Sequence, residues 1–222
     1  MSITRNITGL FFLLISFSLK INAQSDTIMI PEQFLFPEFS TGVLKMKNGE
    51  KVILNLNYNV VNEKMVFKQK DRIYDMVNYS NVDTVFIHQR KFVPVGKVFY
   101  EVIVNAPVSL FVQHKSTIKN PSRPAAYGGT SDVSSSTYIN NMRIGNDVFR
   151  MDSNQEIIIE PKPVSWIRKN NEMYAVTNQK HFQKIFLDRK NVIREFIRQN
   201  HLDIENYDHL IKVVNYYNGL SR

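Results

Sequence analysis

The chain has 222 residues, a formal net charge of +8 and no cysteine, and 43% of its residues are hydrophobic. The lack of cysteine excludes disulfides, a thiol nucleophile, cysteine-ligated metal sites and a lipidated cysteine. The basic excess is concentrated in residues 161–222, which hold eleven Lys or Arg against six Asp or Glu. The body of the protein is therefore close to neutral, which argues against a nucleic acid partner.

Residues 1–23 have the order of parts of a cleaved secretory signal peptide. Arg5 supplies positive charge, the run from Leu10 to Phe17 is mostly apolar, and Ala23 offers a small residue before a cut at Gln24. The apolar run is far shorter than the ~20 residues that a helix needs to span a bilayer. We therefore expect an exported protein, periplasmic or at the outer surface, with no transmembrane segment.

The mature chain begins with residues 24–40, which we expect to be an extended lead-in, and continues with an antiparallel β domain over residues 41–176. Asn48-Gly49 lies between two alternating runs and predicts a hairpin with a type I′ turn. Further short strands, rich in Val, Ile, Phe and Tyr, are predicted at Lys64–Lys68, Arg72–Val77, Val82–His88, Lys91–Val95, Val98–Val104, Val108–His114 and Glu156–Glu160. Their spacing favours a meander, sandwich or barrel.

Residues 117–137 interrupt this pattern with many Gly, Pro and Ser residues, and we expect a flexible loop there. After Val176 the period becomes helical. Residues 177–222 predict helices packed on the β domain, with Asp188 as a candidate N-cap between the first two. The last helix carries an apolar stripe at i, i+3, i+4 and i+7, formed by Leu210, Val213, Val214 and Tyr217.

No catalytic, cofactor-binding or metal-binding residues are assigned, because the sequence carries no motif for such chemistry. No two histidines have the i, i+4 spacing of a helical zinc pair, and there is no G-x-S-x-G or phosphate-binding loop. His88 and His114 fall at the ends of predicted strands, where we expect ordinary surface histidines. Binding is thus favoured over catalysis, and no cofactor is expected.

The candidate binding surface combines aromatic and basic side chains. Lys190, Arg194 and Arg198 are spaced by four residues and share one helical face, which either binds an anionic surface or is simply the solvent side of a docked helix. We favour the docked helix, so peripheral membrane contact is not the preferred interpretation. Tyr127 and Trp166 are candidates for stacking on a sugar or on a partner's side chains.

Several short segments give the chain a resemblance to a known group of proteins. These segments are Ile21-Asn22-Ala23-Gln24, the hairpin from Asn48-Gly49-Glu50-Lys51 to Leu56-Asn57-Tyr58-Asn59, the loop motif Ala126-Tyr127-Gly128-Gly129, and the closing Tyr216-Tyr217-Asn218. The chain resembles uncharacterised secreted proteins of the Bacteroidota type. That group has no assigned activity, so the resemblance implies export and a β-rich domain with a helical tail, and it transfers no functional residue.

The sequence as a whole predicts a mainly β, α+β protein with a C-terminal helical segment. We expect an exported, non-enzymatic envelope protein that binds another macromolecule, either an envelope protein or a glycan. One alternative is a carbohydrate- or ligand-binding accessory domain, and a second is an enzyme whose site is dispersed over the fold.

Overall fold

A computed structural model describes residues 31–70, 72–119, 123–124, 130–131, 140–144, 147–151 and 158–220. The predicted signal peptide lies outside these residues, as do Tyr127 and most of the loop predicted at 117–137. Within the described part of the chain, no helix has both the length and the apolar character needed to cross a membrane.

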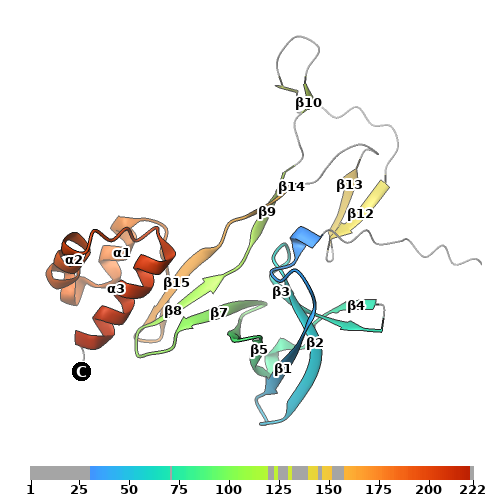
Figure 1. The fold of residues 1–222 in the computed structure, drawn as a ribbon, viewed down its shortest axis with the longest axis horizontal. Helices are drawn as coiled ribbons and strands as arrows, with labels where there is room; N and C mark the ends of the chain where they lie inside the picture. Colours follow the sequence, from blue (N-terminus) through green and yellow to red (C-terminus); the bar gives the residue numbers. More distant parts are fainter. Residues whose placement is uncertain are drawn as a thin grey trace, which may run out of the picture.

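Ten strands form one antiparallel sheet, in the order β16-β15-β8-β7-β6-β5-β1-β2-β3-β4. This sheet and the helices after it confirm the predicted mainly β, α+β class. One end of the sheet curls around its own core, whereas the other carries the helices (Figure 1). The strands are β1 (Ser40–Met46), β2 (Lys51–Asn59), β3 (Lys64–Gln69), β4 (Arg72–Asp75), β5 (Val82–Ile87), β6 (Arg90–Val95), β7 (Val98–Val104), β8 (Ser109–Gln113), β15 (Val164–Lys169) and β16 (Glu172–Ala175).

Three two-stranded pairs lie between β8 and β15 along the chain. Their strands are β9 (Ser116–Lys119) with β14 (Ile158–Pro161), β10 (Arg123–Pro124) with β11 (Thr130–Ser131), and β12 (Asn140–Ile144) with β13 (Asp147–Met151). The β9–β14 pair continues from β8 and leads into β15, so it extends this ribbon beyond the sheet (Figure 1). Residues 117–119 therefore belong to a strand, although the sequence predicted that they begin a loop.

The hairpin predicted at Asn48-Gly49 joins β1 to β2, but its turn differs from the predicted type I′ turn. Of the two central residues only Gly49 has a positive φ, at 89°. The Gly49 N–H donates to Met46 O at 2.9 Å, and the Met46 N–H donates to Glu50 O at 2.8 Å. This pattern is a type I turn followed by a glycine bulge, which is the common alternative for a longer hairpin loop.

Buried amides in β2 attach the lead-in to the sheet. Asn57 Nδ2 donates to Phe36 O at 2.9 Å, and Asn57 Oδ1 accepts from the Phe36 N–H at 3.2 Å. Asn59 Oδ1 accepts from the Val61 N–H at 2.9 Å and so closes the turn after β2. The Asn-Tyr-Asn run of β2 thus has a structural role.

Two short 3₁₀ elements lie outside the strands. One, at Pro31–Gln33, belongs to the lead-in, and the other, at Tyr79–Asn81, precedes β5.

The described residues form two apolar cores, and β7 runs from one to the other, with Phe99 in the first and Val104 in the second. The first core lies inside the curl of the sheet and includes Tyr58, Phe92 and Phe99, none of which reaches solvent. The second core lies under the helices, where Leu110 of β8 and Ile167 of β15 pack against helical side chains. Between the two cores, a register shift between Val102 and Val104 marks a bulge in β7, and bulges bend a strand locally.

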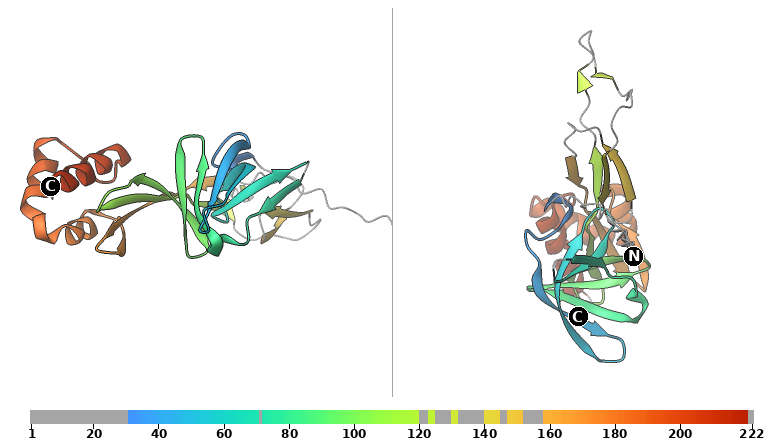
Figure 2. Two further views of the ribbon diagram at one scale, coloured as in Figure 1. Left: turned by 90° about the horizontal axis from the view of Figure 1, so that it is seen from below. Right: turned by 90° about the vertical axis from the view of Figure 1, so that its right-hand side faces the viewer.

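The helical end consists of α1 (Gln179–Ile185), a 3₁₀ turn at Leu187–Arg189, α2 (Lys190–Gln199) and α3 (Tyr207–Leu220). Figure 2 shows these helices gathered at one end of the β7–β8–β15 ribbon. The apolar stripe of α3 faces the second core, and all four of its residues are buried. Asn218 then fixes the end of α3, because its amide both accepts from the Val108 N–H at 3.0 Å and donates to Val108 O at 2.8 Å.

An ionic contact attaches the 3₁₀ turn to β15 and α3. Asp188 does not act as the N-cap that the sequence suggested, because its carboxylate pairs with Lys169 and accepts from the Tyr217 hydroxyl at 2.6 Å. Burial alone would lower the pKa of Lys169, but hydrogen bonds with Asp188 and Tyr217 outweigh it and raise that pKa. Lys169 also lies over the Tyr217 ring, 4.8 Å from its centroid. These contacts hold the helical end on the sheet.

Truncation of the α3 stripe tests this packing. We expect Leu210→Ala to lower the free energy of unfolding by about 2–5 kcal/mol, because it leaves a cavity at a side chain that is 1% exposed. Lys212→Ala, on the exposed side of the same helix, should change it by less than about 0.5 kcal/mol. Chemical denaturation measures both variants, and equal midpoints for the two would contradict the packing of α3.

Candidate binding face of the sheet

Side-chain alternation gives β6, β7 and β8 two different faces. Successive residues of a strand point to opposite sides, and residues directly paired across strands point to the same side. Phe92 pairs with Glu101, and Lys91 pairs with Val102. We call the side with Phe92 and Glu101 the inner face, because it lines the first core, and the side with Lys91 and Val102 the outer face.

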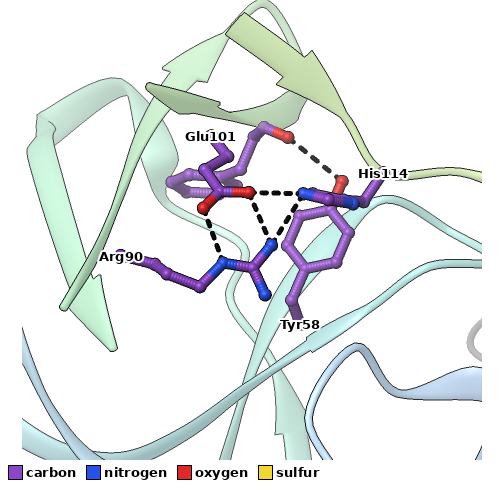
Figure 3. Close-up of polar contacts among 5 residues, drawn as sticks. Tyr58, Arg90, Glu101 and His114 are labelled. Carbon is purple, nitrogen blue, oxygen red and sulfur yellow. Dashed lines mark hydrogen bonds and ion pairs between the residues drawn. The ribbon is translucent and has the colours of Figure 1, made fainter. Parts of the chain in front are cut away.

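The inner face contains a largely buried cluster of ionisable residues, formed by Arg90, Glu101 and His114. Arg90 Nε and Nη2 donate to the two oxygens of Glu101 at 2.5 Å each. His114 Nε2 lies 2.7 Å from Glu101 Oε2 and 3.0 Å from Arg90 Nη2. Figure 3 shows the three side chains converging, with the Tyr58 ring beside His114. The cluster thus joins β6, β7 and the end of β8 through their side chains.

His114 therefore corrects the sequence analysis, which predicted a surface histidine. Its side chain is only 15% exposed, and that of Glu101 is only 9% exposed. Burial alone would raise the pKa of Glu101, but hydrogen bonds from Arg90 and His114 outweigh it and hold that pKa below its ordinary value. Arg90 is also placed by aromatic rings, since its guanidinium carbon lies 5.0 Å from the Phe36 centroid.

This cluster is a structural element of the sheet, and Glu101 also acts electrostatically on a residue of the helical end. Burial, and after it the negative charge of Glu101, raises the pKa of Tyr207 at the start of α3. Within the described residues there is no group of three His, Asp or Glu residues that could hold a metal ion. Both oxygens of Glu101 accept hydrogen bonds, from Arg90 and from His114, so this carboxylate is engaged in holding the strands together.

The outer face carries one continuous row of paired residues that crosses eight strands. Neighbours in this row are about 4.8 Å apart, which is the distance between hydrogen-bonded strands. From β2 to β16 the row is Ile53, Val43, Phe86, Lys91, Val102, Phe111, Trp166 and Ala175. Ile53 is 69% exposed and Phe86 is 38% exposed. Apart from Lys91, the row is therefore apolar and reaches solvent at one end.

The outer face is hollowed where the row passes over β5 to β8. The hollow has a volume of about 460 Å³ and is open to solvent on one side. Its lining includes three cations, Lys47, Lys91 and Arg168, and one carboxylate, Asp83, around an apolar floor that contains Val102 and Phe111. Volumes of about 300–1,000 Å³ are usual for ligand sites in proteins.

The helices do not cover this hollow. They pack on the side of β15 that carries Ile167 and Lys169, and by alternation Arg168 points to the opposite side. Arg168 is held in place there, because its Nη2 donates to Ser109 Oγ at 3.1 Å and its guanidinium carbon lies 5.1 Å from the Phe111 centroid. Ser109 is itself oriented by donating to Ala106 O at 2.7 Å.

The charges around the hollow are not balanced. Asp83 forms an ion pair with Lys45, whose Nζ lies 3.2 Å away. Hydrogen bonds from Lys45 and Thr84 lower the pKa of Asp83, so this carboxyl remains ionised. Among the described residues, no carboxylate lies within ion-pair distance of Lys91, Lys47 or Arg168. The hollow therefore presents an excess of positive charge above an apolar floor.

Of the predicted binding residues, only Trp166 lies on this face. Its ring stacks on Tyr100 with a centroid distance of 5.7 Å, and its Nε1 donates to Gln113 Oε1 at 2.9 Å. Lys190, Arg194 and Arg198 lie on α2, so the structure does not group them with Trp166. Tyr127 is outside the described residues. Lys91, Phe111 and Arg168 were not among the predicted binding residues, because only strand pairing brings them together.

The basic residues of α2 have a different setting. Arg198 forms a bidentate ion pair with Glu195, at 3.0 and 2.6 Å, on the exposed side of the helix. Lys190 and Arg194 border a cleft between α1 and α2 whose floor includes Phe182 and Ile193. The cleft measures about 20 Å³, which is room for about one water molecule. It is too small to bind a ligand in its present form.

Comparisons of the chain with protein-family models, curated proteins and solved structures found no significant match.

Glu101→Gln tests the buried cluster. Because the pKa of Glu101 is lower in the folded protein than in the unfolded chain, its carboxylate stabilises the fold above the unfolded-state pKa. This contribution is lost as the pH falls through the folded-state pKa. At about pH 7 the variant should lose somewhat less than the ~3–5 kcal/mol of a broken buried pair, since 32% of the Arg90 side chain is exposed.

The pH dependence separates this electrostatic role from simple packing. The difference in unfolding free energy between wild type and Glu101→Gln should shrink as the pH is lowered from about 7 to about 3. Denaturant titrations at several pH values measure it, with exposed Glu205→Gln as the matched control. A difference that stays constant over this range would contradict the ionic role of Glu101.

Proposed function

We propose that the protein is an exported, non-enzymatic binding protein of the cell envelope, and that the outer face of its sheet is where it binds a macromolecular partner. The hollow over β5 to β8, with Lys91 and Arg168 above an apolar floor, is the observation that carries this proposal. Export is supported by the signal-like segment at residues 1–23.

Binding accounts for this face better than catalysis does. Among the described residues that line the hollow, the one carboxylate is Asp83, and it is already engaged by Lys45 and Thr84. Arg168 is pre-positioned by Ser109 and Phe111, and a cation fixed in advance loses less conformational entropy when a ligand binds. Desolvated apolar surface beside fixed charges is the composition that favours a stable interface.

A carbohydrate-binding accessory domain is the second candidate, and one observation favours it. Trp166 lies on the same face, and its ring is partly exposed and supported from below by Tyr100. Tyr100 itself is only 6% exposed, so within this stacked pair Trp166 is the ring that a sugar could reach. A glycan partner would therefore depend on Trp166 more than on Lys91 or Arg168.

Charge reversal tests the proposed binding face. The double variant Lys91→Glu with Arg168→Glu should lose capture of its partner from the envelope fraction of the native host, because the hollow then repels an anionic surface. The matched control is Lys190→Glu with Arg194→Glu, which makes the same change of charge on α2. Quantitative pull-down with the mature protein measures both variants, and Trp166→Ala reports on the carbohydrate alternative.

The result that would contradict the proposal is also specific. Unchanged capture by the Lys91 and Arg168 variant, together with loss of capture by the α2 variant, would place the binding surface on the helices. Melting curves check that both double variants remain folded, which we expect because none of the four side chains lies in either core.

A further inference from the structure

We propose that the partner of the outer face is an acidic segment of another protein, in which carboxylates flank one or more apolar side chains. This inference rests on the proposed function and specifies the chemistry of the partner. In the arrangement we infer, the apolar side chains lie along the row from Phe86 to Phe111, and the carboxylates pair with Lys91 and Arg168.

The apolar part of the partner follows from the row itself. Ile53, Val43 and Phe86 are direct neighbours on β2, β1 and β5, and they lead into the hollow at Lys91. Ile53 and Phe86 are both exposed although they are large and hydrophobic. Burying them against apolar side chains would remove surface from water at roughly 25 cal/mol per Å².

The acidic part follows from the excess of cations over carboxylates in the lining of the hollow. Lys91 stands between Phe86 and Val102 in the row, so apolar residues flank the base of its side chain. Its charge helps to lower the pKa of Asp83, but that carboxylate is already paired with Lys45. Arg168 extends over Phe111, two strands further on, which places the two cations on the order of 10 Å apart along the row. A guanidinium group fixed over a ring also favours bidentate binding of a carboxylate.

The composition of the face distinguishes a protein segment from an acidic polysaccharide. Sugar rings are bound by flat aromatic faces and by dense hydrogen-bonding groups, whereas the part of the row from Ile53 to Phe111 is built of Ile, Val and Phe around one lysine. The indole N–H of Trp166 is already donated to Gln113 and is not available to a hydroxyl group. Aliphatic side chains next to cations match a chain that alternates apolar and acidic residues.

Binding of defined polymers tests this inference. The probe is a soluble glutamate–tyrosine copolymer, which carries both carboxylates and apolar rings, and the comparison polymers are polygalacturonate and poly-L-lysine. Titration of the mature protein, followed by fluorescence anisotropy of the labelled polymer, should give saturable binding of the copolymer. Binding should weaken between about 50 mM and about 500 mM salt, because salt screens the ion pairs.

Neutral variants identify the residues responsible. Lys91→Gln with Arg168→Gln should weaken binding of the copolymer at least about tenfold, since each charged hydrogen bond contributes appreciably. Phe86→Ser should weaken it further without changing the salt dependence. Lys190→Gln with Arg194→Gln removes the same charge from α2 and should leave the affinity within about twofold of wild type.

Each contrary outcome has a defined meaning. Equal and Lys91-dependent binding of polygalacturonate would overturn the acidic protein segment while leaving the outer face as the binding site. No binding of the copolymer, with capture from the envelope still dependent on Lys91 and Arg168, would overturn only the inferred chemistry. Loss of copolymer binding in the α2 variant, with full binding in the Lys91 and Arg168 variant, would overturn both proposals.

Discussion

The ionic contact between Arg90 and Glu101 is the constraint on which the rest of the sheet depends. A carboxylate this deeply buried is tolerated only because two nitrogens of Arg90 and one of His114 satisfy its oxygens. These partners come from β6 and from the end of β8, so the contact sets the register of both strands against β7. A slip of one residue would expel Glu101 from its partners and reverse both faces.

The same constraint determines what the outer face displays. Because Arg90 points inward, Lys91 must point outward, and because Glu101 points inward, Val102 must point outward. Beyond the bulge in β7, the ribbon formed by β8 and β15 carries the helices on its inner side and Arg168 on its outer side. The same strand register thus places the buried cluster on the inner face and the binding residues on the outer face.

Much of this fold could be predicted from the sequence, because alternation and turn residues are local signals. The hairpin at Asn48-Gly49, the strand Val98–Val104 and the stripe of α3 all follow from spacing alone. The buried cluster could not be derived in this way, since its members are 11 to 24 residues apart along the chain. One signal was available, because Glu101 is the only charge within the apolar run Val98–Val104. The outer row could not be predicted from the sequence, because it depends on how eight strands pair with one another.

The central claim is that the partner binds on the outer face of the sheet. Amide shift mapping of the isotope-labelled mature protein, titrated with the glutamate–tyrosine copolymer, tests it most directly. The account predicts the largest shifts at Phe86, Lys91, Val102, Phe111 and Arg168, with α2 unchanged. Shifts confined to α1 and α2, with the strands of the outer face unperturbed, would contradict it.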